Sequence, residues 1–379
     1  MTKKDGKRIL FVDHYYPKYL ESFYKSHPDI FSKTYKIAFS ELMAGMFGTS
    51  DFYSSGLKNN GFESWDVVAN ATSLQKLWIK ENSGLNLYPW EKIIDKIVKA
   101  PAYISDRQAG FWEYKVLTKQ IDKYKPDVLY TQNISYLNPF FLNEVKKKVK
   151  LLVGQIASPL PPNIFLKPYD LIISSLPNLV SEIRSRGIKS EYQKLAFEPR
   201  VLEKIGKQKR IYDVTFVGSF TPYHQEGIKI LEEIARHIPV HVWGQGIEFL
   251  SPLSPFRKNY HGEAWGLDMY KIFAQSKITI NRHISISGQY ANNMRLYEAT
   301  GMGAMLITDH KRNLNDLFEV GKEVVEYKNS KDIIDKISYY IKNEAKRETI
   351  AKAGQKRTLK EHNYLNRMKE LIKIVKKYI

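Results

Sequence analysis

The chain has 379 residues, enough for two domains of ordinary size with hydrophobic cores that need no disulfide or structural metal. It contains no cysteine, which excludes disulfides, thiolate metal sites and cysteine nucleophiles. The 59 Lys and Arg against 40 Asp and Glu give a net charge of +19, which suits nucleic acid, an anionic membrane surface or phosphorylated small molecules as partners. A lysine-rich composition from an AT-rich gene accounts for the same charge, and this alternative stays open.

Short apolar runs alternate with longer helical patterns in the first half of the chain. Strands are predicted at Arg8–Asp13, Trp65–Ala69, Asp127–Thr131, Leu151–Gln155 and Asp170–Ser174. Helices are predicted near Tyr35–Asn59, Asp106–Tyr124, Asn138–Lys147 and Asn178–Arg186. The strand-like runs are continuously apolar, which is typical of strands buried on both faces of a parallel sheet. The alternation therefore predicts a doubly wound α/β domain.

The alternation pauses at the charged stretch Glu198–Arg210 and then restarts. Predicted strands follow at Val214–Val217, Val240–Trp243, Ile278–Asn281, Ala304–Thr308 and Glu323–Tyr327, with helices at Gln225–His237, Trp265–Gln275 and Asn292–Thr300. We expect an N-terminal domain over 1–200, a C-terminal domain over 211–362 and a last helix over 363–379. That helix carries an apolar stripe, expected to pack back onto the N-terminal domain, of Met368, Leu371, Ile372, Val375 and Ile379.

The chain carries no targeting or membrane signal that we recognise. The apolar run Ile9–Val12 is shorter than the ~7–15 residues of a signal-peptide core. No window approaches the ~18 apolar residues of a transmembrane helix. We therefore expect a soluble, cytoplasmic protein.

Several catalytic motifs are absent, and their absence narrows the function. There is no phosphate-binding loop ending in Gly-Lys-Ser/Thr, no zinc-protease helix and no serine nucleophile elbow. Gly244-Gln245-Gly246 lacks the third glycine of a dinucleotide fingerprint. No Asp-x-Asp pair occurs, so we expect no metal site for a nucleoside diphosphate.

The informative segment is Asn292–Asp309, which predicts a helix followed by a buried strand. Asn292 or Asn293 can cap the helix, whose free N–H groups favour an anion. Arg295 and Glu298 share one face, and a carboxylate there can accept hydrogen bonds from a ribose diol. An ordinary Arg–Glu surface pair is the alternative that spacing alone leaves open.

The pattern Asn-x-Arg-x-Tyr-Glu-Ala-x-Gly-x-Gly-Ala-x-Leu-Ile-Thr-Asp resembles the signature of group 1-type glycosyltransferases of the GT-B fold, in the branch that includes the spore maturation protein CgeB. The segments Val217–Phe220, Trp243–Gly246 and Tyr260–Glu263 resemble the donor-domain loops of that family. The likeness covers roughly residues 211–370, whereas the first half is similar only in architecture.

The resemblance implies two Rossmann-like domains that face each other across a cleft. The C-terminal domain would bind a nucleoside-diphosphate sugar, with UDP as the expected nucleotide and no further cofactor, and the N-terminal domain would bind the acceptor. Glu298 would bind the ribose hydroxyls, and Asn292, Asn293 and Arg295 would face the diphosphate or the sugar. Other expected donor-site residues are Gly218, Ser219, Gln245 and His261.

Two positions depart from the family pattern. Tyr290 stands where many relatives carry a second glutamate, and the loop Thr221–Gln225 lacks the Arg and Lys that many relatives carry. Other cations must then meet the diphosphate charge: Arg282, His283 and Arg295 first, then Lys311 and Arg312. We expect Arg282 to act in catalysis by stabilising the leaving group in place of a metal.

Asp13 and His14 directly follow the first predicted strand, where α/β sheets present residues to a crevice. Either side chain could be the general base for an acceptor hydroxyl. A helix-capping aspartate and a partly buried histidine are the alternative.

These observations predict a metal-independent glycosyltransferase that acts on a glycan, lipid-linked or other hydroxyl acceptor, with retention favoured over inversion. Another GT-B enzyme, an epimerase or a phosphorylase, remains an alternative. A basic nucleic-acid-binding protein, or a transferase acting on nucleic acid, is a second. Peripheral contact with an anionic membrane would also use the net charge.

Overall fold

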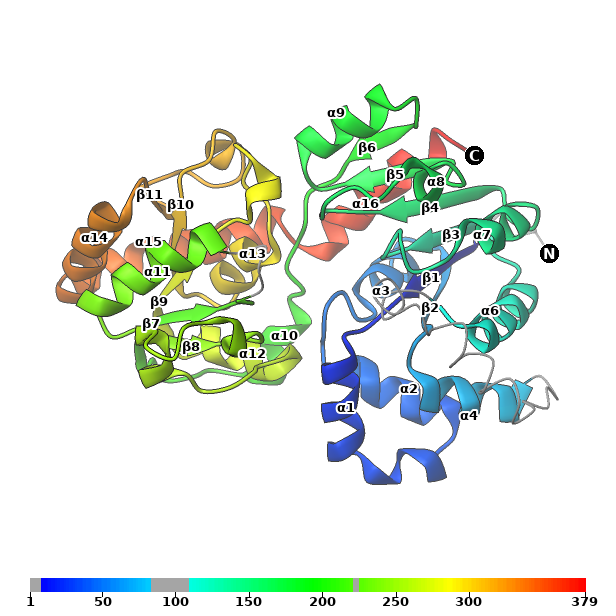
Figure 1. The fold of residues 1–379 in the computed structure, drawn as a ribbon, viewed down its shortest axis with the longest axis horizontal. Coiled ribbons are helices and arrows are strands. Elements are labelled where there is room, and N and C mark those ends of the chain that lie inside the picture. The colour runs from blue at the N-terminus through cyan, green and yellow to red at the C-terminus, as the bar shows by residue number, and fades with distance from the viewer. Residues whose placement is uncertain (1–7, 83–108, 221–224) are drawn as a thin grey trace. The chain divides into compact units, whose positions relative to one another are not determined.

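The computed structural model describes residues 8–82, 109–220 and 225–379, which form two compact α/β units (Figure 1). The first unit comprises Met1–Gln193 and Met368–Ile379, and the second comprises Lys194–Arg367. Each unit contains one parallel sheet with helices packed against it, as the alternating pattern predicts. The start of the helix predicted from Asp106 and the loop 221–224 lie outside the described residues.

The first unit contains a six-stranded sheet in the order β2-β1-β3-β4-β5-β6. Ile9–Val12 of β1 are at most 2% exposed, which explains why this run is apolar without interruption. Because β2 and β3 flank β1, the strand order reverses beside β1, and the carboxyl end of β1 faces that switch point. The strands are β1 Arg8–Asp13, β2 Glu63–Val68, β3 Val128–Thr131, β4 Leu151–Gln155, β5 Leu171–Ser174 and β6 Ser190–Tyr192.

The helix predicted over Tyr35–Asn59 is wrong as a single element, because it is two helices separated by a loop. In that loop Met46, Gly48 and Ser50 have φ angles of 52°, 59° and 40°, and a left-handed residue cannot continue a right-handed helix. Sequence reasoning also missed the helices α1, α4 and α8 and the three-residue strand β6. The helices are α1 Pro17–Ser26, α2 Tyr35–Ala44, α3 Phe52–Lys58, α4 Thr72–Asn82, α6 Phe111–Tyr124, α7 Pro139–Lys146, α8 Asn163–Leu166 and α9 Pro177–Ser185.

The second unit contains a five-stranded parallel sheet in the order β11-β10-β9-β7-β8, so the strand order reverses between β7 and β9. Its strands are β7 Tyr212–Val217, β8 His241–Trp243, β9 Ser276–Asn281, β10 Met305–Asp309 and β11 Val325–Tyr327. Leu231 of α11 and Ile333 of α14 join one side of the core, and α12 and α13 contact β9. Its helices are α10 Arg200–Ile205, α11 Gln225–His237, α12 Gly266–Ala274, α13 Met294–Gly301, α14 Ser330–Lys342 and α15 Glu344–Glu361.

The last helix, α16 Tyr364–Lys376, carries the predicted apolar stripe. Its residues from Met368 onward belong to the first unit, and Tyr378 donates a hydrogen bond to Glu191 there (2.9 Å). Met368, Leu371 and Val375 are buried, whereas Ile379 is 40% exposed. None of the helices in the described ranges has the length and apolarity that a membrane span requires.

Some of the basic side chains have bonding partners within their own unit, three of them in ion pairs at the surface. Lys146, Lys148 and Lys150 pair with Asp170, Asp122 and Asp127 at 2.6, 2.6 and 2.9 Å. The guanidinium of Arg210 donates to the carbonyls of residues 273, 274 and 276 at 3.1, 2.7 and 3.0 Å. It therefore closes the end of α12, which needs partners for its last carbonyls.

Candidate functional site

The predicted donor-site residues gather at the carboxyl end of the second unit's sheet. Gly218 and Ser219 directly follow β7, and Arg282 and His283 directly follow β9. The strand order reverses between these two strands, and in open α/β sheets ligands bind in the crevice at such a switch point. The topology therefore brings together residues that lie more than sixty positions apart in the sequence.

Two glycines allow the loops after β7 and β8 to pack closely together at this site. The Gly218 N–H donates to the Trp243 carbonyl (3.0 Å), which ties the loop after β7 to the end of β8. Gly244 has a φ of 153°, and a Cβ there would lie 1.6 Å from the Gly218 carbonyl oxygen. Only glycine fits this approach of two backbones. Gln245 continues the connection, since its carbonyl accepts from the Phe220 N–H (2.9 Å) and its amide reaches the Ser219 hydroxyl (3.4 Å).

The start of α13 is joined to the end of β9 through Asn293. Its side-chain oxygen caps the helix by accepting from the Leu296 N–H (3.2 Å), as expected of an N-cap. Its side-chain amide donates to the Asn281 side chain (2.8 Å) and to the Arg282 carbonyl (3.3 Å). Asn293 thus holds the two ends of the loop 282–293 together.

Buried polar atoms without partners lie in the same loop. Asn292 is 7% exposed, and within the described residues neither its side-chain oxygen nor its amide nitrogen has a hydrogen-bond partner. The same holds for Nε2 of His283, whose side chain is fully buried. Each such atom costs about 1–3 kcal/mol unless a water or a ligand group satisfies it. Both residues flank the ends that Asn293 joins, so their unpaired atoms lie within the switch-point site.

His283 is held by Asp309 at the end of β10. Both its Nδ1 (2.7 Å) and its backbone N–H (3.0 Å) contact Oδ1 of Asp309. Burial alone would raise the pKa of Asp309, but His283 and Lys311 outweigh it and lower that pKa below its usual value. Lys311 also donates to the Gly288 carbonyl (2.6 Å), and Arg312 bonds to the Gln289 side chain (3.1 Å). Lys311 and Arg312 therefore stabilise the loop 282–293.

Arg295 reaches from α13 to the end of β7. Its Nε donates to the Val217 carbonyl (2.9 Å), next to Gly218, and one Nη forms an ion pair with Glu298. The Glu298 side chain is 2% exposed, whereas that of Arg295 is 30% exposed. The Tyr270 hydroxyl donates to the other Glu298 oxygen (3.4 Å). Arg295 is the accessible member of the pair, and Glu298 lies beneath it.

Arg282 lies against the first turn of α11. A Cβ on Gly227 would be 2.7 Å from both Cδ and Nε of Arg282, so the glycine leaves room for this side chain. The Arg282 charge also faces the Tyr327 hydroxyl, whose pKa burial nevertheless raises strongly. Sequence reasoning did not identify Gly227, because no local pattern indicates that a glycine in a helix makes room for an arginine far away in the sequence.

We expect Gly227→Ala to lower the kcat/KM of the transferase predicted from the sequence about ten- to hundredfold, because displacing a positioned group by about 1 Å has effects of that size. The added methyl must push Arg282 aside, because the three heavy atoms nearest to it all belong to that side chain. Steady-state kinetics of that reaction measures the effect. Lys229→Ala, an exposed change on the same helix, is the control. Wild-type kinetics in Gly227→Ala would show that the placement of Arg282 does not matter.

His261 lies along the outer side of the edge strand β8. Its ring stacks on Trp243 (4.5 Å between centroids), and its Nε2 meets Nδ1 of His241 (2.9 Å). Burial and the neighbouring His261 lower the pKa of His241. The contacts of the His261 ring are thus with this aromatic cluster, while its neighbour Gly262 accepts from the Gly244 N–H (3.0 Å).

In the first unit, Asp13 and His14 lie where β1 ends, at the switch point of that sheet. Asp13 accepts from the His14 N–H (2.7 Å) and from the Thr49 hydroxyl (3.3 Å). Burial raises the pKa of Asp13 to about 6. The His14 ring packs on Tyr136 (4.6 Å), which comes from the segment after β3. The sequence carries no signal for Thr49 or Tyr136 as neighbours of this pair.

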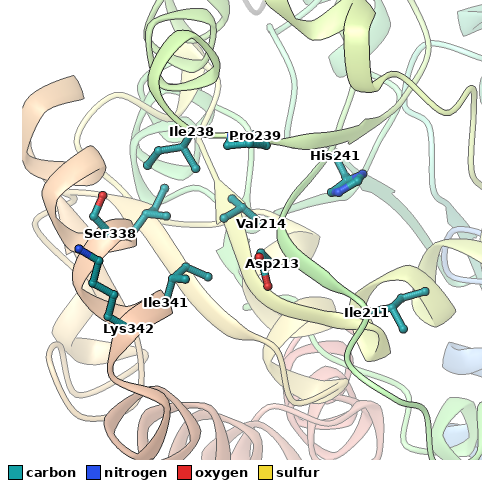
Figure 2. Close-up of a pocket in the computed structure, with 10 residues that line it drawn as sticks. Ile211, Asp213, Val214, Ile238, Pro239, His241, Ser338, Ile341 and Lys342 are labelled. Carbon is teal, nitrogen blue, oxygen red and sulfur yellow. The ribbon is translucent and has the colours of Figure 1, made fainter.

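A separate cavity of about 340 Å³ lies at the amino ends of the strands in the second unit's sheet (Figure 2). Asp213 and Val214 line it from the start of β7, His241 from the start of β8, and Ile341 and Lys342 from the end of α14. Because these are the amino ends of the strands, the cavity is distinct from the switch-point site.

Comparison with known proteins agrees with this geometry. Residues 225–373 match the glycosyl transferase-like family. No curated protein sequence is significantly similar to the chain.

Solved structures of similar fold include sucrose-phosphate synthase from Thermosynechococcus elongatus, with a TM-score of 0.59 and 10% identity over 98% of each chain. Anabaena HepE in complex with UDP-glucose has a TM-score of 0.59 and 11% identity over 98% of this chain and 99% of that one. A glycosyltransferase from Rickettsia africae has a TM-score of 0.57 and 12% identity over 99% of each. The predicted GT-B fold is thereby confirmed, and so is the prediction of a glycosyltransferase.

Proposed function

We propose that this glycosyltransferase transfers a sugar from a UDP-sugar to a hydroxyl-bearing acceptor, and that the donor binds at the switch point between β7 and β9. The observation that carries the proposal is the gathering of Gly218, Arg282, Asn292 and Arg295 at this one edge of the unit that matches the family. The complex of Anabaena HepE, which shares the fold, with UDP-glucose supports uracil as the base.

The chemistry of the site suits a diphosphate joined to a sugar. Arg295 and Arg282 supply positive charge, and the bond from Arg295 to the Val217 carbonyl holds one guanidinium beside Gly218. Asn292 needs both a donor and an acceptor, as a sugar hydroxyl provides and a phosphate oxygen does not. We therefore assign the arginines to the diphosphate and Asn292 to the sugar.

We further propose that transfer needs no metal. In the reaction, negative charge develops on the leaving diphosphate, and fixed cations stabilise such charge without reorganisation. Arg282 and Arg295 are the candidates for this role. Across the described residues, no group of three or more His, Asp or Glu side chains could hold a metal ion. Activity that persists in EDTA is the test.

For the acceptor, we propose a saccharide or lipid-linked hydroxyl bound by the first unit. If transfer inverts the anomeric configuration, Asp13 and His14 are the candidates to take the acceptor proton, and a pKa of about 6 leaves Asp13 largely ionised at pH 7.5. If transfer retains it, the leaving diphosphate takes that proton. We favour retention of the anomeric configuration, because relatives with the second-glutamate pattern commonly retain it, although Tyr290 replaces that glutamate here. Proton NMR of the first product formed decides between retention and inversion.

The donor proposal is tested by thermal shift with UDP, GDP, dTDP, CDP and ADP, each with and without EDTA. UDP at a hundredfold excess over Kd is expected to stabilise the protein by about 2.7 kcal/mol, with EDTA having no effect. Arg295→Gln should remove most of the shift, and Lys229→Ala should keep it.

Absence of any shift with all five nucleotides would overturn the donor site. A shift only with a polyanion, lost at high salt, would favour nucleic-acid binding instead. Conversion of a UDP-sugar to its epimer without transfer would favour the epimerase.

A further inference from the structure

The pair formed by Arg295 and Glu298 departs from what the resemblance implies. A carboxylate that binds a ribose diol must present an oxygen to the ligand. Here the Glu298 side chain is 2% exposed, and both its oxygens already accept hydrogen bonds, one from Arg295 and one from Tyr270. A ribose could reach Glu298 only if Arg295 moved away.

Arg295 has reasons to stay in place. Its Nε is bonded to the Val217 carbonyl (2.9 Å), and its guanidinium lies over the Phe273 ring at 5.8 Å from the centroid. Across the described part of the chain, its second Nη makes no hydrogen bond. The Arg295 guanidinium is therefore held in place on two sides. It still has free N–H groups beside Gly218, where the proposed nucleotide-sugar site lies. A guanidinium held in this way is suited to a phosphate.

We propose that Glu298 is a positioning residue, which orients the Arg295 guanidinium toward the diphosphate, and that it does not itself bind the ribose. This inference rests on the proposed function, because it concerns the same donor site. Glu298 lowers the net charge of the site, so its contribution to diphosphate binding is geometric. It holds the Arg295 guanidinium in one of the many orientations that an exposed arginine can adopt.

The three roles that Glu298 could have predict different results for Glu298→Gln. The glutamine is isosteric, and its side-chain oxygen can still accept from Tyr270. If Glu298 positions Arg295, UDP binds more weakly. If it acts only through its negative charge, UDP binds more tightly, because a repulsive charge is gone. If it binds the ribose, the preference for UDP over 2′-deoxy-UDP decreases.

The experiment measures dissociation constants of UDP, 2′-deoxy-UDP and uridine, the last by competition, for wild type and variants. We expect Glu298→Gln to weaken UDP and 2′-deoxy-UDP by the same factor, about tenfold, and uridine by less than twofold. Arg295→Gln should have the same pattern, and the double variant should be no weaker than Arg295→Gln alone, as for residues acting as one unit.

Glu344→Gln is the matched control, because Glu344 also pairs with an arginine three residues away (Arg347, 3.3 Å) but on α15. It should leave all three constants unchanged. A selective loss of UDP over 2′-deoxy-UDP in Glu298→Gln would overturn the inference, as would tighter UDP binding. Additive effects in the double variant would also overturn it. If wild type binds no nucleotide, the proposed function itself fails, and this result is distinct from the other three.

Discussion

Gly244→Ala is expected to destabilise the second unit by about 4 kcal/mol or more, an exceptionally large loss for one substitution, because it forces backbone to move. The new Cβ would lie 1.6 Å from the Gly218 carbonyl oxygen and 2.7 Å from its carbonyl carbon. Neither atom belongs to a flexible side chain, so the ends of β7 and β8 must separate. The hydrogen bond from Gly218 to Trp243 would be lost with that separation.

The effect is measured as the midpoint of urea unfolding of the second unit, followed by Trp243 and Trp265 fluorescence in a chain whose other tryptophans are replaced by phenylalanine. Gly262→Ala is the matched control. Gly262 also has a positive φ, 92°, but no atom lies within 4 Å of its Cβ position. It should cost about 1–2 kcal/mol from backbone strain alone. Equal losses in the two variants would contradict the role of the close approach at Gly244.

Asp66→Asn is expected to stabilise the first unit by about 2–4 kcal/mol at pH 8 and to have little effect at pH 4. Asp66 lies on β2, where burial raises its pKa from 3.8 to about 7, and Asp51 and Asp13 add to the shift. Between pH 4 and pH 7 the Asp66 carboxyl is ionised in the unfolded chain but stays largely protonated in the folded chain. Wild-type stability therefore falls as pH rises through this window.

The asparagine removes the ionisation and keeps the shape, and its oxygen can still accept from the Ser54 hydroxyl, which bonds Asp66 in the wild type. Urea unfolding of both proteins between pH 4 and pH 8 measures the difference. Asp122→Asn, at an exposed ion pair with Lys148 in the same unit, should show no such gain. Parallel stability profiles for wild type and Asp66→Asn would refute the prediction.

The sequence predicted the strands well because each buried strand of a parallel sheet must be apolar on both faces. Ile9–Val12, for example, is apolar in every position and is buried in every position. The same reasoning failed over Tyr35–Asn59. The break there depends on left-handed residues, two of which, Met46 and Ser50, are not glycine and carry no helix-ending signal. The surrounding tertiary structure stabilises those conformations.

By itself, the sequence determined the class of the fold and the segment Asn292–Asp309 in which the donor site was sought. Periodicity and capping are local properties, and they are readable from neighbouring residues. Only the tertiary structure decided that Arg295 reaches the Val217 carbonyl, that Glu298 is buried beneath it, and that Gly244 meets Gly218. These contacts depend on the order of strands in the sheet and on side-chain depth. Neither property is encoded in the spacing of residues along the chain.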